Sequence, residues 1–254
     1  MKEIYQVLTG AMGQETRMAQ IANNLANVNT TGFKRDGAVF LDELRIRMED
    51  GATGTPIDPA APEPARTAVA AAGLPRGYID FSDGPIRQTG RELDVAIAGE
   101  GFFMVEGPDG AHRYTRAGAF VLNAEGELTT PDGRQVLDAG GQPIAVQVEA
   151  GPVRIAPDGR VMAGEAEQGR LGVARFDEPW RLAKHGEGLL AAPDGMAPEP
   201  VAEPALRPGA LEGSNVNPIE EMVRMIQTQR IYETQQRLVR TIDELAQRRI
   251  EAAQ

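Results

Sequence analysis

Long helical segments at the two ends of the chain constrain its fold more than any other feature. Residues 219–251 contain neither Pro nor Gly, and the first Pro of the 254-residue chain is Pro56. A helix of ~33 residues extends roughly 50 Å at ~1.5 Å per residue, which is more than a small domain requires. The middle of the chain is instead rich in Gly and Pro, so the ends and the middle form different kinds of structure.

The C-terminal helix has a strong start signal. Ser214, Asn215 and Asn217 can accept hydrogen bonds from the free N–H groups of a first turn. Pro218 suits the first helical position, where a missing N–H costs nothing. Glu220 and Glu221 follow where the positive end of the helix dipole favours them. These residues predict a helix that begins at Pro218.

Apolar residues on this helix recur in alternating steps of three and four, which is the spacing of coiled-coil contacts. One row contains Met222, Met225, Tyr232, Val239, Ala246 and Ile250, and a neighbouring row contains Ile231, Leu238, Ile242 and Leu245. Two adjacent rows indicate contact with more than one partner helix.

The N-terminal segment has a similar pattern. Residues 1–30 are expected to form a helix, and Gly32 is a plausible stop. Its row of contacts consists of Ile4, Leu8, Ala11, Glu15, Met18, Ala22 and Leu25. Neither end can bury its row against adjacent sequence, so we expect the ends to pair with each other, with other copies, or with both.

Four Asn residues lie within seven positions near the end of the N-terminal helix: Asn23, Asn24, Asn27 and Asn29. Asn costs a helix roughly 0.5 kcal/mol relative to Ala, so such a cluster is unusual. Asn27 shares a helical face with Asn23 or Asn24, and their amides could bond a neighbouring chain. A frayed helix end capped by Asn29 and Gly32 is the alternative.

The middle of the chain reads as short strands separated by turns. Residues 93–105 (LDVAIAGEGFFMV) contain alternating apolar residues, and turn signals such as 108–110 (PDG), 131–133 (PDG) and 157–159 (PDG) recur. We therefore expect an α+β fold: long N- and C-terminal helices forming an α-helical coiled-coil domain, plus a central all-β domain. The expected boundaries are 1–35 and 213–254 for the helical domain, 36–77 for a Pro/Ala/Gly-rich connector and 78–212 for the β domain.

Composition excludes several classes of function. The net charge of −11 and the absence of cysteine argue against nucleic-acid partners, thiol catalysis and iron–sulfur clusters. His112 and His185 lack a second ligand at metal spacing, so no metal site or cofactor is expected. The N-terminus lacks the basic and apolar regions of a secretory signal, and no apolar run approaches the ~20 residues of a membrane span.

Three stretches together resemble the flagellar axial family, the bacterial rod and hook proteins. They are residues 21–34 (IANNLANVNTTGFK), residues 93–105 with 114–118 (YTRAG) and 126–130 (GELTT), and residues 211–222 (LEGSNVNPIEEM). Within the family, the chain length, residues 211–215 and residues 151–159 (GPVRIAPDG) look most like the proximal rod protein. Residues 225–232 (MIQTQRIY) are also similar to the distal rod protein.

The resemblance implies a structural subunit, not an enzyme, that polymerises through its terminal helices into a tubular drive shaft around an export channel. Its implied partners are copies of itself, other flagellar rod proteins and the flagellar type III export apparatus, with no nucleic acid and no small-molecule substrate. Its implied location is the periplasmic rod of the basal body, reached without a cleaved signal peptide. The residues expected to pack against neighbouring subunits are Ile4, Leu8, Met18, Ile21, Asn23, Asn24, Leu25, Asn27, Gly32, Phe33, Asn215, Asn217, Met222, Met225, Ile226, Tyr232, Leu238, Val239, Ile242 and Leu245.

Other interpretations remain open at this stage. A distal rod or hook-type subunit would have the same general architecture. A β-rich enzyme acting on cell-wall glycan would need a carboxylate pair roughly 5–10 Å apart, for which Asp94 and Glu100 are the candidates. A third possibility is an acidic binding module with a helical stalk.

Overall fold

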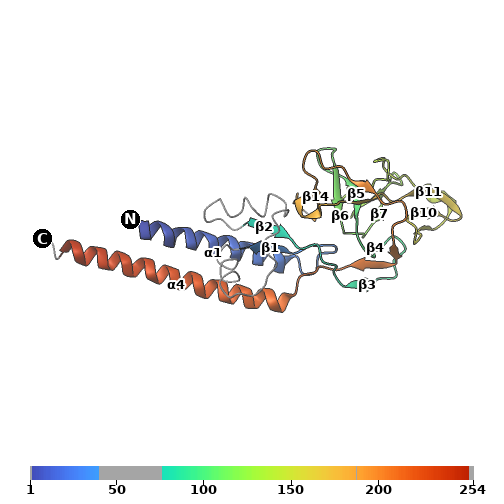
Figure 1. Cartoon of the computed structure of the whole chain (residues 1–254). Helices are drawn as coiled ribbons and strands as arrows, with labels where there is room; N and C mark the ends of the chain where they lie inside the picture. Colours follow the sequence, from blue (N-terminus) through green and yellow to red (C-terminus); the bar gives the residue numbers. More distant parts are fainter. Residues whose placement is uncertain (1, 40–75, 187, 252–254) are drawn as a thin grey trace, which may run out of the picture. The chain divides into compact units, whose positions relative to one another are not determined.

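The computed structural model describes residues 2–39, 76–186 and 188–251, and these form two compact units. Unit 1 contains the described parts of 1–26, 36–79 and 217–254, and unit 2 contains 27–35 and the described parts of 80–216. Both units are therefore assembled from segments that lie far apart in the sequence, as the colours of Figure 1 show. Each unit is described in turn below.

Unit 1 consists of two helices and a small sheet. Helix α1 (Lys2–Ala26) and helix α4 (Pro218–Glu251) lie side by side in Figure 1, with their N-termini at opposite ends of the pair. Strands β1 (Asp36–Val39) and β2 (Arg76–Ile79) pair antiparallel, so that Asp36 lies opposite Ile79. Most of the predicted connector, residues 40–75, lies outside the described residues.

Local sequence explains where α4 begins. The Asn217 side-chain oxygen accepts hydrogen bonds from the backbone N–H groups of Ile219 (3.1 Å) and Glu220 (3.5 Å). Pro218 occupies the first helical position, as predicted, because its missing N–H has no partner to lose there. The helix then continues through 34 residues without a Gly or Pro after the first position.

Helix α1 ends four residues earlier than the predicted boundary at residue 30. A turn follows the helix, in which the Thr30 N–H donates to the Asn27 carbonyl at 3.1 Å. The backbone then passes through Gly32 with a φ of 67°. The left-handed region is readily available only to Gly, so this residue redirects the chain out of the helix.

The fold class expected from the sequence is wrong. The described chain is mostly β, with seventeen short strands and only two α-helices, and no coiled-coil domain forms at its ends. Among the α4 side chains that the structure describes, Glu221 and Thr228 are buried, whereas Met222 and Leu238 of the predicted rows are 51% and 52% exposed. The apolar periodicity predicts an apolar contact between the helices, but the most buried of these α4 side chains are polar.

Unit 2 is built from short strands and two 3₁₀ helices. Its elements are β3 (Ile86–Gln88), β4 (Val95–Ile97), β5 (Phe102–Glu106), β6 (His112–Thr115), β7 (Val121–Leu122), β8 (Leu128–Thr129), η1 (Val148–Ala150), β9 (Val153–Ile155), β10 (Arg160–Ala163), β11 (Ala166–Arg170), β12 (Val173–Arg175), η2 (Pro179–Arg181), β13 (Ala183–Lys184), β14 (Leu190–Ala191), β15 (Glu199–Pro200), β16 (Leu206–Pro208) and β17 (Ala210–Glu212). The largest sheet has the order β13-β14-β6-β5-β12-β15, and a second has the order β11-β10-β9.

Strand pairing in unit 2 combines local hairpins with long-range closure. The PDG turns at 108–110 and 157–159 connect β5 to β6 and β9 to β10, at positions where the sequence predicted turns. The late strands β16 and β17 return to pair with β4 and β3, again antiparallel. These two pairings bring the segment before α4 against the beginning of the unit.

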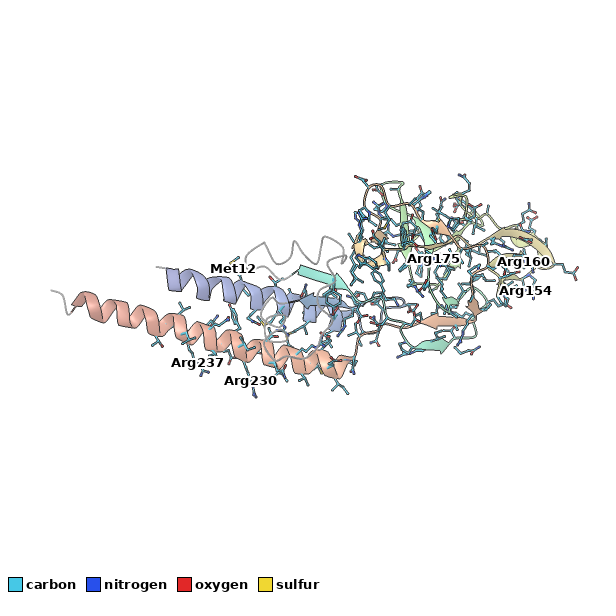
Figure 2. The ribbon with its side chains drawn as sticks, in the orientation of Figure 1. Met12, Arg154, Arg160, Arg175, Arg230 and Arg237 are labelled. Carbon is cyan, nitrogen blue, oxygen red and sulfur yellow. The ribbon has the colours of Figure 1, made fainter. Side chains whose placement is uncertain are left out.

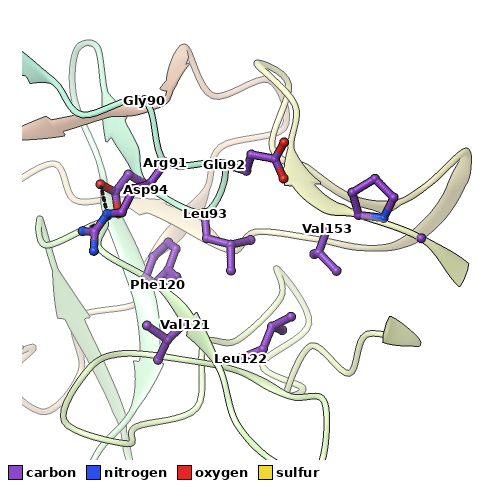
Figure 3. Close-up of a pocket in the computed structure, with 11 residues that line it drawn as sticks. Gly90, Arg91, Glu92, Leu93, Asp94, Phe120, Val121, Leu122 and Val153 are labelled. Carbon is purple, nitrogen blue, oxygen red and sulfur yellow. Dashed lines mark hydrogen bonds and ion pairs between the residues drawn. The ribbon is translucent and has the colours of Figure 1, made fainter. Parts of the chain in front are cut away.

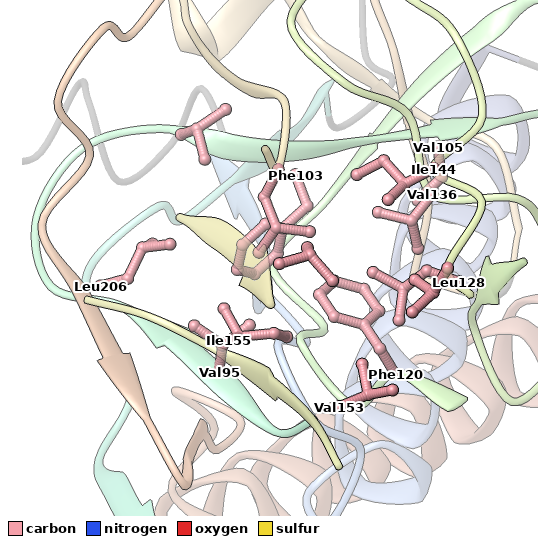
Figure 4. Close-up of a cluster of buried hydrophobic side chains, with 14 of the residues drawn as sticks. Val95, Phe103, Val105, Phe120, Leu128, Val136, Ile144, Val153, Ile155 and Leu206 are labelled. Atoms are coloured by element: carbon pink, nitrogen blue, oxygen red, sulfur yellow. The ribbon is translucent and has the colours of Figure 1, made fainter. Parts of the chain in front are cut away.

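The core of unit 2 lies between these sheets and is aliphatic with a few aromatic rings. Phe103 and Phe120 pack edge to face with their ring centroids 5.2 Å apart, and Figure 4 shows them among Val105, Leu128 and Val136. Strand β5 is buried on both faces from Phe102 to Val105. Its residues therefore do not show the inside–outside alternation that a half-exposed sheet would have.

Candidate assembly surface

The contact between α1 and α4 holds one antiparallel register. Position numbers on α1 rise as those on α4 fall, as they must for two helices that run in opposite directions. The facing pairs that define the register are Gly10 with Gln235, Glu15 with Tyr232 and Asn24 with Glu221.

Polar and small residues form this contact. The Tyr232 hydroxyl donates to Glu15 Oε1 at 2.9 Å. A Cβ atom added at Gly10 would lie 3.1 Å from the Gln235 side-chain nitrogen, so the absence of a side chain allows the close approach. Thr228 is buried on the same face of α4. The α1–α4 contact therefore uses few of the apolar residues that the sequence offers.

Asn24 joins three elements of unit 1. Its side-chain amide donates to the Asp36 carbonyl and accepts from the Asp36 N–H, both at 2.8 Å, so it pairs with the start of β1 as a strand backbone would. The same amide nitrogen lies 3.5 Å from a Glu221 carboxylate oxygen on α4. Asn24 is 1% exposed, and these bonds satisfy its polar atoms in that buried position.

Several apolar residues of α4 lie on the face of the helix that is turned away from α1. Ile219, Met222, Val223 and Ile226 are spaced as one helical face and are all exposed, with Ile226 54% exposed. Two positions along a helix correspond to a rotation of about 200°. Each of the exposed residues 219, 223 and 226 comes two positions before a buried or half-buried one, namely 221, 225 and 228. The exposed residues therefore lie on the side of α4 away from its buried positions. Figure 2 shows Arg230 and Arg237 continuing this outward face. We call residues 219, 222, 223 and 226 the outer face of α4.

A buried ion cluster lies in unit 2, where its N-terminal and C-terminal segments meet. Glu212 lies at its centre and accepts from Lys34 Nζ at 2.7 Å, from Arg116 Nη1 at 3.3 Å and from the Gly84 N–H at 2.9 Å. Lys34 Nζ also donates to the Ser82 carbonyl at 2.8 Å. Three segments distant in sequence are thereby fixed to one carboxylate.

Burial changes the chemistry of this cluster. Removing the ammonium group from water lowers the pKa of Lys34 below its usual 10.5, while its hydrogen bond to Glu212 and the charge of that carboxylate act in the opposite direction. The Lys34 and Glu212 side chains are only 3% and 2% exposed. A pair this deeply buried is costly to separate, because each charge would remain without its partner in a medium of low polarity.

Two further residues of the predicted packing set, Phe33 and Asn215, make contacts within unit 2. Asn215 accepts from the Arg35 N–H at 2.7 Å, and its amide donates to the Asp80 carbonyl at 2.8 Å. Phe33 is buried, and Lys184 Nζ lies 3.9 Å from the centroid of its ring. Through these contacts, residues 33–35 are held by Asn215, which also bonds Asp80, and by Lys184.

Comparison with known proteins gives three matches in chain order. Residues 4–34 match the family described as flagella basal body rod protein, and residues 96–163 match the flagellar hook protein FlgE/F/G D1 domain. Residues 207–251 match the flagellar basal body rod FlgEFG protein C-terminal family.

Individual relatives match over almost the whole chain. The flagellar basal-body rod protein FlgF of Caulobacter vibrioides is 36% identical, covering 98% of this chain and 96% of the relative. The chain belongs to the flagellar basal-body rod protein family. The rod protein FlgF of Mesorhizobium japonicum (33% identical, 93% and 91% covered) and the rod protein FlgG of Agrobacterium fabrum (34%, 97% of each) are further relatives.

The relatives therefore confirm the prediction that this chain is a flagellar rod protein of the proximal type. This rod protein is a structural subunit of the bacterial flagellar basal body, and it assembles with other components of the rod. These conclusions rest on the relatives, and the structure shows which side chains are available for the assembly.

The structure distributes the predicted packing residues of the rod protein over three settings. The exposed ones are Asn23, Asn217, Met222, Ile226 and Leu238, and the half-buried or buried ones in unit 1 are Met18, Ile21, Asn24, Leu25, Met225, Tyr232 and Val239. Those in unit 2 are Asn27, Gly32, Phe33 and Asn215. The side chains of Ile4, Leu8, Ile242 and Leu245 lie outside what the structure describes, although their backbones are helical.

The carboxylates considered for glycan cleavage are not brought into one site. Asp94 is buried and accepts from Thr89 Oγ1 (2.6 Å) and Arg91 Nε (2.8 Å) beside a cavity of about 680 Å³ (Figure 3). Glu100 is exposed and lines a different groove. The pair therefore lacks the shared cleft that glycoside hydrolysis requires.

The described part of the chain has neither a metal-binding cluster nor a membrane-spanning helix. No group of three or more His, Cys, Asp or Glu side chains in that part of the rod protein could hold a metal ion. Neither described helix has an apolar stretch long enough to cross a bilayer.

Local sequence patterns do not predict the ion cluster. Lys34, Arg116 and Glu212 all occur within the stretches that resemble the family, but nothing in those stretches points to a cluster of charges. The available signal was the position of Glu212 two residues after Ala210 on a short strand, since alternate residues share one face of a strand. Ala210 is buried, and so is Glu212.

Proposed function

We propose that the rod protein joins neighbouring subunits through the outer face of α4. The observation that carries this proposal is the exposure of Ile219, Met222, Val223 and Ile226 on the side of the helix turned away from α1. Burying apolar surface is worth about 25 cal/mol per Å², so covering four such side chains is a substantial driving force for association. Contiguous exposed apolar groups on a soluble chain commonly mark a protein interface.

Copies of the same chain are the first expected neighbours, followed by other rod subunits. When the outer face of α4 contacts a different surface of the next subunit, the contact need not close on itself and can generate a helical tube. Such a tube would enclose the export channel and transmit torque. The polar α1–α4 contact supports this proposal, because it fixes the pair of helices while leaving apolar side chains for neighbours.

We also propose that the protein reaches the periplasm through the flagellar type III export apparatus without a cleaved signal. The chain has no cysteine, so no disulfide has to form or break during passage. Its role in the rod is structural and involves no catalysis, and the separation of Asp94 from Glu100 supports this assignment over glycan cleavage.

The test replaces one residue of the outer face. Ile226→Asp introduces a charge into the proposed contact, whereas Gln227→Asp places the same charge one position away, at a residue that is also exposed. We expect both variants to keep wild-type helix content by circular dichroism. Only Ile226→Asp should lower incorporation into isolated basal bodies, by at least about tenfold if ~1.4 kcal/mol or more is lost per contact.

Incorporation would be measured by immunoblot of purified basal bodies against whole-cell protein. Equal incorporation of the two variants would show that the outer face of α4 is not an assembly contact. Loss of helix content in Ile226→Asp alone would show that this face is already covered within the chain.

A further inference from the structure

A second surface, in unit 2, combines aromatic rings with negative charge. We call it the aromatic groove, a cavity of about 580 Å³. Its rings are Phe81, Phe102, Phe176 and Trp180, and its outer carboxylates are Asp83, Glu100 and Asp177. Its lining residues all belong to unit 2, so its role does not depend on the proposed contact of α4.

The rings of the groove are held in place by one another. Phe102 packs edge-on to Phe81 at a centroid distance of 5.6 Å and lies 6.1 Å from Phe176. Trp180 lies on η2 and is 47% exposed, although it is a large apolar side chain and the only Trp of the chain. The Arg116 guanidinium of the chain itself already lies 5.2 Å from the centroid of the Phe102 ring, and Phe102 and Phe176 are buried. Trp180 is therefore the ring of the groove that offers an open π surface to a ligand.

The positive charges near the groove are already matched. Arg116 pairs with Glu212 at 3.3 Å and lies 3.9 Å from Asp83, and Arg175 pairs with Glu199 at 2.9 Å. The residues that line the groove include three carboxylates, Asp83, Glu100 and Asp177, and two cations, Arg116 and Arg175, so the lining carries a net charge of −1.

Electrostatics at Arg175 show the same excess of negative charge. Its pKa is raised, chiefly by the hydrogen bond and charge of Glu199, and to a smaller extent by the charges of Glu100 and Asp177. Those two carboxylates therefore act on the same region of the groove.

We propose that the aromatic groove binds an arginine side chain presented by a neighbouring rod subunit. A guanidinium stacks on aromatic rings and donates to carboxylates, and these are the two kinds of group that the groove offers. A neutral ligand such as a saccharide could stack on Trp180, but it would leave the net negative charge uncompensated. Charge complementarity thus favours the cation.

The single tryptophan makes the groove measurable in the full-length chain. Acetyl-Gly-Arg-Gly-amide would be titrated while the fluorescence of Trp180 is recorded. The peptide with citrulline in place of Arg is the matched probe, because it keeps the shape and loses the charge. We expect saturable quenching by the arginine peptide and binding at least about fivefold weaker for the citrulline peptide, the size expected of a partly exposed cation–π contact.

Variants locate the site. Glu100→Gln with Asp177→Asn should weaken the arginine peptide at least about fivefold, since both neighbouring charges are removed. Glu165→Gln with Asp132→Asn changes the net charge equally, at exposed residues that do not line the groove, and should leave binding unchanged.

Three outcomes would overturn the proposal: no saturable quenching, equal binding of the two peptides, or stronger quenching by chitotriose than by the arginine peptide. The wild-type comparison of the two peptides holds even if the Glu100/Asp177 variant fails to fold. Peptide binding is measured on the free chain, so its failure would leave the role of α4 untouched.

Discussion

At the scale of single residues, the chain depends on a few positions where its two terminal segments enter unit 2. Gly32 is one of them, because a Cβ atom there would lie 2.3 Å from the Ala117 nitrogen. Glu212 is another, because three donors from separate segments converge on it. Substitution at either position tests whether the junction between the segments stabilises the unit.

Gly32→Ala should destabilise unit 2 much more than Gly90→Ala. Both residues have positive φ, 67° and 75°, so each Ala should cost about 1 to 2 kcal/mol for its backbone conformation. Only Gly32 is also crowded by backbone, which should add about 1 to 3 kcal/mol, whereas nothing lies within 4 Å of a Cβ at Gly90. Urea denaturation of the two variants measures the difference, and equal losses would show that residues 30–34 are not docked as described.

Glu212→Gln should cost about 3 to 5 kcal/mol of unfolding free energy, because it leaves Lys34 and Arg116 buried without their counter-charge. Glu199→Gln is the control, since it breaks an exposed pair with Arg175 that is worth at most about 1 kcal/mol. Thermal and urea unfolding would compare them. A Glu212 variant as stable as the Glu199 variant would contradict the cluster.

At the scale of elements, the contact between the helices explains why the fold class was mispredicted. Within residues 18–26 of α1, the predicted row contains Met18, Ala22 and Leu25, but Ile21 and Asn24 are the buried residues. The row is displaced by one residue, which corresponds to about 100° around the helix. The spacing of apolar residues predicts that α1 and α4 have faces suited to helix packing. It does not predict that a glycine, Gly10, and an amide, Asn24, lie at the contact between them.

Asn24→Ala tests the connection between α1 and β1. It removes both hydrogen bonds to the Asp36 backbone, and leaving partly buried polar groups unpaired costs about 1 to 3 kcal/mol. Met12→Ala, at an exposed position of the same helix, should change stability by no more than about 0.5 kcal/mol. Hydrogen exchange of the Asp36 amide should accelerate in the first variant only, and unchanged protection would rule out this bond.

At the scale of the whole molecule, unit 2 includes a segment near the N-terminus that precedes all of the unit's strands in the sequence. Residues 27–35 belong to it together with 80–216. Residues 27–35 thus contribute a buried ring, Phe33, and a buried cation, Lys34, to the interior of a unit whose other residues are 80–216. We therefore expect that the stability of unit 2 depends on the N-terminal segment as well as on the strands.

Deletions separate the two roles of the N-terminal segment. Removing residues 1–26 keeps 27–35 and should leave unit 2 folded, whereas removing residues 1–35 should destabilise it by several kcal/mol through loss of Phe33 and the Lys34 pair. The unfolding midpoint of unit 2, followed by Trp180 fluorescence, distinguishes the two variants. Identical midpoints would show that residues 27–35 contribute nothing to the unit.

Features that depend only on neighbouring residues can be predicted from the amino-acid sequence. The start of α4 at Pro218, the turns at the PDG segments and the family resemblance all follow from short runs whose chemistry is local. Which face of each helix is covered, and which charges meet, depends on the three-dimensional fold. Burial and pairing depend on residues distant in sequence, as when Glu212 meets Lys34 across 178 positions, and no local periodicity encodes that encounter.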